Sequence, residues 1–156
     1  MPGAQRTSPQ ELASLIKSAR DIMRKDKGLS GDADRLPMLT WIMFLKFLDD
    51  KERQREDEAA LGGIAYRPAI EAPYRWRDIT AQPGNPTGDE LLKFITLDDR
   101  APRPDGTEGP GLFAYLRALR SDNGQGRRDV VARVFEGVTN RMQSGYLLRD
   151  VIDKVD

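Results

Sequence analysis

Residues 36–48 read LPMLTWIMFLKFL, and only Pro37, Thr40 and Lys46 among them are not apolar. A helix that is apolar nearly all round either lies in a protein core or spans a membrane. A membrane span needs about 20 apolar residues, and the charged run DDKE at 49–52 ends this segment well before that length. The segment is also longer than an ordinary strand. It therefore predicts the central buried helix of a helical domain.

The fold class predicted from this segment is mainly α, a compact helical domain around a buried central helix at about 34–59. Proline fits a helix best in the first turn, so Pro37 predicts that this helix begins near Asp34 or Arg35. The side chain of Asp32 or Asp34 is then expected to cap its N-terminus. The expected core side chains, five from this helix and one from a later helix, are Trp41, Ile42, Phe44, Leu45, Leu48 and Phe135.

The rest of the chain predicts further helices that pack against the central one. Ser8 and Glu11 form a capping box that opens the first helix, and Gly28 is expected to end that helix. Residues 1–7 are expected to be flexible, and 8–156 to form one helical domain. Apolar stripes at helical spacing predict later helices at 91–95 (after a capping box at 87–90), 112–119, 130–138 and 147–155.

A long Pro/Gly-rich segment at 62–88 interrupts the helical pattern, and its first two glycines are expected to stop the central helix. Helical periodicity is absent there, and such long segments are usually functional or mobile. Within it we expect a short strand at 64–66, with Trp76 and Ile79 anchoring the segment to the helices. A second Pro/Gly-rich stretch contains Asp105-Gly106, which predicts a turn.

Composition excludes several classes of chemistry. The chain has 156 residues, 25 basic and 25 acidic, with neither Cys nor His. Disulfides, thiolate catalysis, Ser-His-Asp triads and most zinc sites are thereby excluded. Because residues 1–10 lack the apolar core of a signal peptide, we expect a cytoplasmic protein without a membrane partner.

The charged tail of the central helix offers a weak alternative, a small enzyme with a hard metal ion. Carboxylates bind such ions, but a charge run on a helix is usually solvated. The acidic residues concerned are Asp49, Asp50, Glu52, Glu56, Asp57 and Glu58.

Two pairs of arginines are the candidate DNA contacts. Arg75 and Arg77 alternate with aromatic residues, a pattern that can stack on bases and hold phosphates. Alternatively, Trp76 packs inward and these arginines only face solvent. Arg127 and Arg128 lie in the predicted first turn of a helix, where positive charge opposes the helix dipole. A broken local rule can mark function, although screening by solvent would also explain it.

Three sequence features, in this order, resemble the N-terminal helical domain of the modification (methyltransferase) subunit of type I restriction-modification systems. The first is an initial helix followed by the dense segment at 38–50, MLTWIMFLKFLDD. The second is YRWRDI at 74–79. The third is RVFE at 133–136, followed by LLRDVIDKV at 147–155.

The resemblance implies that the parent subunit transfers a methyl group from S-adenosylmethionine to the N6 amine of adenine in DNA. Catalysis in the family resides in a following domain with an Asn-Pro-Pro-Tyr-type motif that holds a flipped adenine. Here Asn85-Pro86 continues with Thr87. We therefore expect no catalytic, cofactor-binding or metal-binding residue in this chain, and a catalytic domain downstream of it.

The partners implied by the resemblance are the specificity subunit, a second modification subunit and double-stranded DNA. This domain would assist assembly and closure around DNA, with weak, salt-sensitive and sequence-independent binding. The alternative is a freestanding helical protein-interaction module without a nucleic-acid role, which a reading frame continuing into a methyltransferase domain would exclude.

Overall fold

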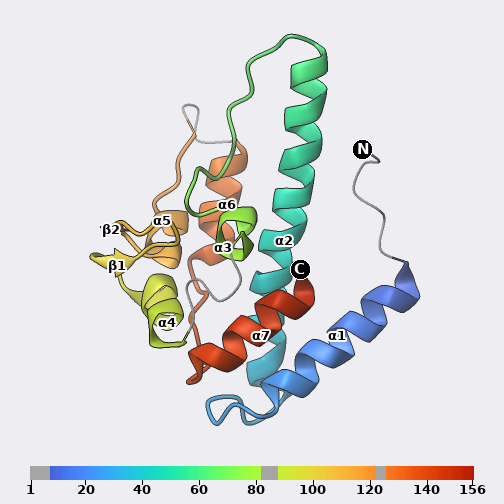
Figure 1. Ribbon diagram of the computed structural model, residues 1–156, viewed down its shortest axis with the longest axis vertical. Helices are drawn as coiled ribbons and strands as arrows, with labels where there is room; N and C mark the ends of the chain where they lie inside the picture. The colour runs from blue at the N-terminus through green and yellow to red at the C-terminus, as the bar shows by residue number, and fades with distance from the viewer. Residues whose placement is uncertain (1–7, 82–87, 122–125) are drawn as a thin grey trace.

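The computed structural model describes residues 8–81, 88–121 and 126–156, and in these ranges the chain is mainly helical, as predicted (Figure 1). The elements in chain order are α1 (Pro9–Met23), α2 (Asp32–Leu61), α3 (Trp76–Thr80), α4 (Gly88–Thr96), β1 (Ala101–Pro102), β2 (Glu108–Gly109), α5 (Leu112–Arg117), α6 (Arg127–Phe135) and α7 (Gly145–Val155). No helix in the described part of the chain is long and apolar enough to cross a membrane.

The predicted central helix is α2, and it extends two residues beyond the predicted limits at each end. The predicted start was wrong, because Gly31 is the N-cap and Pro37 lies in the second turn. The predicted side-chain cap is also absent at this end. The carboxylate of Asp34 instead accepts hydrogen bonds from the backbone and hydroxyl of Ser30. We attribute the tolerated proline to the buried residues that follow it, beginning with Met38, because tertiary packing overrides local propensity.

α2 is buried on one side only. Trp41, Ile42 and Leu45 are at most 2% exposed. Phe44 and Leu48, expected in the core, are half-buried and pack against its edge. The expectation of a helix buried all round was wrong, because Leu36 and Phe47 are nearly half exposed.

α1 begins with the predicted capping box of Ser8 and Glu11. The helix ends at Met23, so the prediction that Gly28 ends it was wrong by five residues. The buried carboxylate of Asp26 explains the early end. It accepts hydrogen bonds from the backbone N–H groups of Gly28, Gln143 and Ser144, and so holds the turn after α1 against the start of α7.

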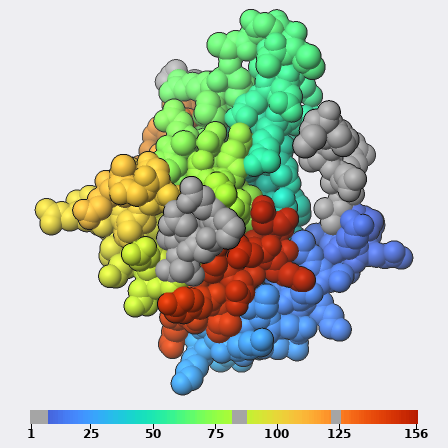
Figure 2. All heavy atoms as spheres, viewed as in Figure 1, coloured from blue at the N-terminus to red at the C-terminus, as the bar shows by residue number. Residues whose placement is uncertain are grey.

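α7 packs between α1 and α4 (Figure 2). Its apolar stripe is buried as predicted, with Leu148, Val151, Ile152 and Val155 at most 1% exposed. The approach to α4 is close, because a Cβ atom on Gly145 would lie 1.8 Å from the carbonyl oxygen of Gly88. Phe135 of α6, the remaining expected core residue, is fully buried.

The Pro/Gly-rich segment that follows α2 is mostly irregular, as predicted. Gly62 is the C-cap of α2, and Gly63 has a positive φ of 67°. The strand expected at 64–66 does not form. The segment contains a helix that was not predicted, α3, whose Trp76 and Ile79 are buried and anchor it as expected.

The structure confirms the predictions for the later turn and helices only in part. β1 and β2 pair antiparallel around the predicted turn, where Gly106 has a φ of 85°. The apolar stripe of α6 was predicted wrongly in part, because Val130 and Val134 are 50% and 40% exposed. The cap expected from Thr87 lies outside the described residues.

Candidate nucleic-acid interface

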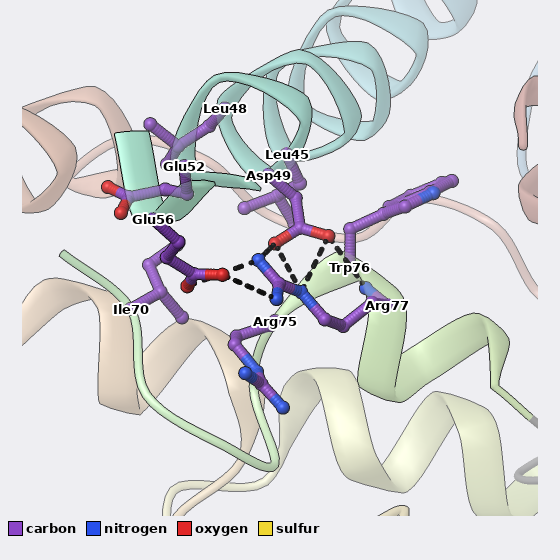
Figure 3. A pocket seen from close by; sticks show the side chains of 9 residues that line it. All are labelled: Leu45, Leu48, Asp49, Glu52, Glu56, Ile70, Arg75, Trp76 and Arg77. Carbon is purple, nitrogen blue, oxygen red and sulfur yellow. Dashed lines mark hydrogen bonds and ion pairs between the residues drawn. The ribbon is translucent and has the colours of Figure 1, made fainter. Parts of the chain in front are cut away.

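Arg77 joins α3 to the middle of α2 (Figure 3). Its guanidinium donates hydrogen bonds to Asp49 at 2.8 and 3.0 Å and to Glu56 at 3.0 Å. The backbone N–H of Arg77 also donates to Asp49, whose side chain is only 6% exposed. Burial alone would lower the pKa of Arg77, but the two carboxylates raise it above its ordinary value. The guanidinium therefore stays charged as the internal partner of a buried carboxylate.

Arg75 is also held by a carboxylate. Its Nε and Nη2 atoms each donate to Asp78 at 2.8 Å, a bidentate pair within α3 and its cap. These hydrogen bonds raise the pKa of Arg75. The alternation of arginine and aromatic residues at 74–77 thus places Trp76 in the core and both arginines in ion pairs.

Arg127 belongs to a second cluster, which is centred on the buried carboxylate of Glu52. Its Nη1 atom donates to Glu52 of α2 at 2.9 Å and also to the hydroxyl of Tyr66. The same carboxylate accepts hydrogen bonds from that hydroxyl and, at 3.3 Å, from the backbone N–H of Ala69. Burial and the bond to Glu52 raise the pKa of Tyr66. Glu52 therefore ties α2, the segment after it and the start of α6 together.

Arg128 pairs with Glu71 at 3.1 Å, and the Glu71 side chain is 59% exposed. Beside Arg127 and Arg128 lies an open cavity of about 370 Å³ between the segment after α2 and the start of α6. Its lining residues are Arg67, Pro68, Ala69, Ser121, Gly126, Arg127 and Arg128.

The structure thus separates the four predicted arginines into two sites. Arg75 and Arg77 lie at α3 against the middle of α2, whereas Arg127 and Arg128 line the cavity with Arg67. Arg67 was not predicted as a site residue. It lies directly before a proline in an irregular segment, and no sequence pattern there indicates a binding role.

Three of the six carboxylates on the tail of α2 are partners of arginines, and Asp50 pairs with Lys46. Asp49 and Glu52 are buried in such pairs, and Glu56 completes the first of them. Among the described residues, no group of three acidic side chains is placed to hold a metal ion.

Comparisons with known proteins agree with the resemblance. A family model for the HsdM N-terminal domain matches residues 12–155. The methylase subunit of the type I restriction enzyme EcoEI from Escherichia coli is 38% identical over 146 residues, which cover 93% of this chain and 26% of that protein.

Two solved structures share the fold. A modification subunit assigned to a type I restriction enzyme of Vibrio vulnificus YJ016 matches 99% of this chain and 32% of its own length, with a TM-score of 0.93 and 64% identity. A chain from a study of complex assembly and conformational transition of the type I R-M system matches 96% of this chain and 26% of its own, with a TM-score of 0.70 and 31% identity.

The chain therefore spans between a quarter and a third of the length of these relatives. The resemblance read from the sequence is confirmed. The chain belongs to the family of HsdM N-terminal domains, found in the methylase subunits of type I restriction-modification systems.

Proposed function

We propose that this chain is the non-catalytic assembly domain of a type I DNA methylase subunit, which joins partner subunits and helps to close the complex around DNA. Transfer of a methyl group from S-adenosylmethionine to adenine N6 belongs, in this proposal, to a catalytic domain downstream. The partners are a specificity subunit and a second modification subunit, in the cytoplasm. Family membership supports the proposal, together with the coverage of only a quarter to a third of each relative.

The observation that carries the assembly role is the apolar tip of α2, defined as residues 61–65. The C-terminal part of α2 extends well beyond α1 and α7 (Figure 1). At its end Leu61 is 91% exposed and Ile64 is 70% exposed. Contiguous exposed apolar surface marks protein contacts, whereas singly scattered apolar side chains do not. We assign this tip to a contact with a partner subunit of the assembled complex.

The DNA part of the proposal rests on Arg127 and Arg128, because they line an open cavity. The pairs of Arg75 and Arg77 serve the fold, since Asp49 would lose its main cationic partner if Arg77 turned toward DNA. Binding to DNA should be weak and should fall steeply with salt, because phosphate contacts release counterions.

The assembly role is tested with the complete modification subunit carrying Leu61→Asp and Ile64→Asp. If the tip is buried in a subunit contact, the two introduced carboxylates would lose water without gaining partners, which destabilises the contact. The variant is mixed with the specificity subunit, and the molar mass of each eluted species is measured by size-exclusion chromatography with light scattering. We expect free subunits in place of the complex, while circular dichroism and thermal melting stay unchanged.

The matched control carries Leu61→Met and Ile64→Val, which keep the tip apolar, and it should assemble like the unchanged subunit. Normal assembly of the Asp variant would refute the assignment of the tip as a subunit contact.

A further inference from the structure

We propose that the cavity between residues 67–69 and the start of α6 is a phosphate-binding site, and that its ligand is a backbone phosphate of duplex DNA. This inference rests on the DNA part of the proposed function and names the site that carries it. It adds Arg67, which the sequence pattern did not single out.

The charge of the lining residues favours an oxyanion. Arg67, Arg127 and Arg128 line the cavity, and none of the described lining residues is acidic. Three guanidinium groups around one opening favour a phosphate as ligand, because their planar N–H groups match its oxygens. An apolar ligand would remove water from these guanidinium groups without offering them hydrogen bonds, which costs free energy. The lining therefore disfavours apolar ligands.

The walls of the cavity are held in place from behind. The buried carboxylate of Glu52 accepts a hydrogen bond from the backbone of Ala69 in one wall and from Arg127 in the other. Asp129 accepts hydrogen bonds from the backbone N–H groups of Ser121 and Gly126, which both line the cavity. The positions of these groups are therefore fixed before a ligand arrives, which lowers the entropy cost of binding.

Donor groups remain for a ligand after these internal contacts are made. Arg127 uses one guanidinium nitrogen, Nη1, for Glu52 and Tyr66 and is 40% exposed. A guanidinium has five N–H donors. The side chain of Arg128 is 18% exposed and that of its partner Glu71 is 59% exposed. A phosphate can therefore replace the carboxylate of Glu71, which moves into water at little cost.

The size of the site also fits a phosphate on a polymer. A cavity of about 370 Å³ with a wide opening gives room for one phosphate group and the adjoining sugar. The opening allows the chain of a nucleic acid to continue on both sides, as a closed pocket would not. The site reads no base, so the binding should be independent of sequence.

The test is a fluorescence-anisotropy titration of the 156-residue chain with a short DNA duplex between 50 and 200 mM salt. The cavity variant carries Arg67→Ala and Arg128→Ala and leaves Arg127 to neutralise Glu52. The control variant carries Lys17→Ala in α1 and Arg24→Ala at the C-cap of that helix, both exposed, and so also loses two positive charges. Thermal melting verifies that each variant is folded.

We expect the cavity variant to bind about tenfold more weakly at 50 mM salt, with a salt slope lower by about 1, because the site neutralises one backbone phosphate. The control should keep the salt slope of the unchanged chain. Should the double variant not fold, Arg67→Ala alone, at an exposed residue, should weaken binding and lower the slope by less than about 1, because Arg127 and Arg128 still contact the phosphate.

Equal binding by the cavity and control variants would overturn the cavity site and leave DNA contact elsewhere on the domain. Absence of binding by the unchanged chain at 50 mM salt would overturn both the site and the DNA part of the proposed function. The assembly test at the α2 tip is independent of either result.

A second arm separates DNA from free phosphate. Melting temperatures are compared in phosphate and chloride at equal ionic strength, and we expect phosphate to stabilise the unchanged chain but not the cavity variant. If that difference appears while both variants bind DNA equally, the site takes small anions only, and the assignment to the DNA backbone is overturned.

Discussion

Replacement of Arg77 by Met tests whether α3 is fixed to the central helix by a buried ion pair. Arg77→Met keeps the length and apolar stem of the side chain but removes the guanidinium that Asp49 and Glu56 share. Asp49, only 6% exposed, then keeps the backbone N–H of residue 77 and the more distant Nε of Arg53 at 3.6 Å. Glu56 is 31% exposed and can be hydrated.

The structure sets the expected loss of stability at the lower end of the usual range. Breaking a buried ion pair by removing one partner costs about 3–5 kcal/mol. Because Arg53 and one backbone donor still compensate Asp49, we expect about 3 kcal/mol for Arg77→Met. The double variant Arg77→Met with Asp49→Leu removes the uncompensated charge as well, and should recover to within about 1 kcal/mol of the unchanged chain.

Urea unfolding followed by circular dichroism measures the effect. With a slope near 2 kcal/mol per molar urea, a loss of 3 kcal/mol lowers the midpoint by about 1.5 M. Arg24→Met, which removes an exposed arginine, is the control and should change the midpoint little. A loss below about 1 kcal/mol for Arg77→Met, or a double variant less stable than the single one, would refute the role of this pair.

Three further predictions follow from packing and titration. Phe44→Ala should cost about 2 kcal/mol in urea unfolding, less than for a fully buried ring, and a loss near zero would place the ring in solvent. Gly145→Ala should cost about 3 kcal/mol in thermal melting because its Cβ would meet the carbonyl of Gly88. Gly137→Ala, with nothing within 4 Å of its Cβ, is the control and should leave the melting temperature nearly unchanged. Hydrogen bonds lower the pKa of Asp129 below its ordinary value of 3.8. The carboxylate therefore contributes fully to the free energy of unfolding above pH 3.8, and this contribution is lost as pH falls through the lowered pKa. The stability difference between the chain and Asp129→Asn should therefore shrink below about pH 4, and a difference independent of pH would contradict this linkage.

Local features of the sequence predicted local structure well. The capping box at Ser8 and Glu11, the stop at Gly62 and the turn at Asp105-Gly106 each depend on a few neighbouring residues. The central helix was also predictable, because its apolar run is too long for a strand. Its start was not, since the proline rule describes an isolated helix and the buried residues after Pro37 override it.

The candidate site was only partly predictable, because its contacts join residues far apart in the chain. Arg77 and Asp49 are 28 residues apart, and Arg127 and Glu52 are 75 apart. Spacing along the chain says nothing about such pairs. Arg127 and Arg128 were noticed because positive charge opposes the helix dipole, and the structure explains their tolerance by the carboxylates of Glu52 and Glu71.

α3 and the exposed side of α6 show two other limits of sequence patterns. α3 has five residues, too few for a helical period to be recognised. Val130 and Val134 fit the apolar stripe of α6, yet they remain exposed because the side of the helix with Val131 and Phe135 meets the core. A stripe predicts which side chains share a face, but not how much of that face is covered.

The most direct test of the assembly role is hydrogen–deuterium exchange of the modification subunit, alone and in the assembled complex. Peptides that cover residues 58–66 report on the α2 tip. Peptides that cover α1 serve as an internal reference. We expect exchange at the tip to slow in the complex while exchange in α1 stays the same. Equal exchange at the tip in both states would contradict a subunit contact at the α2 tip and would require another surface for assembly.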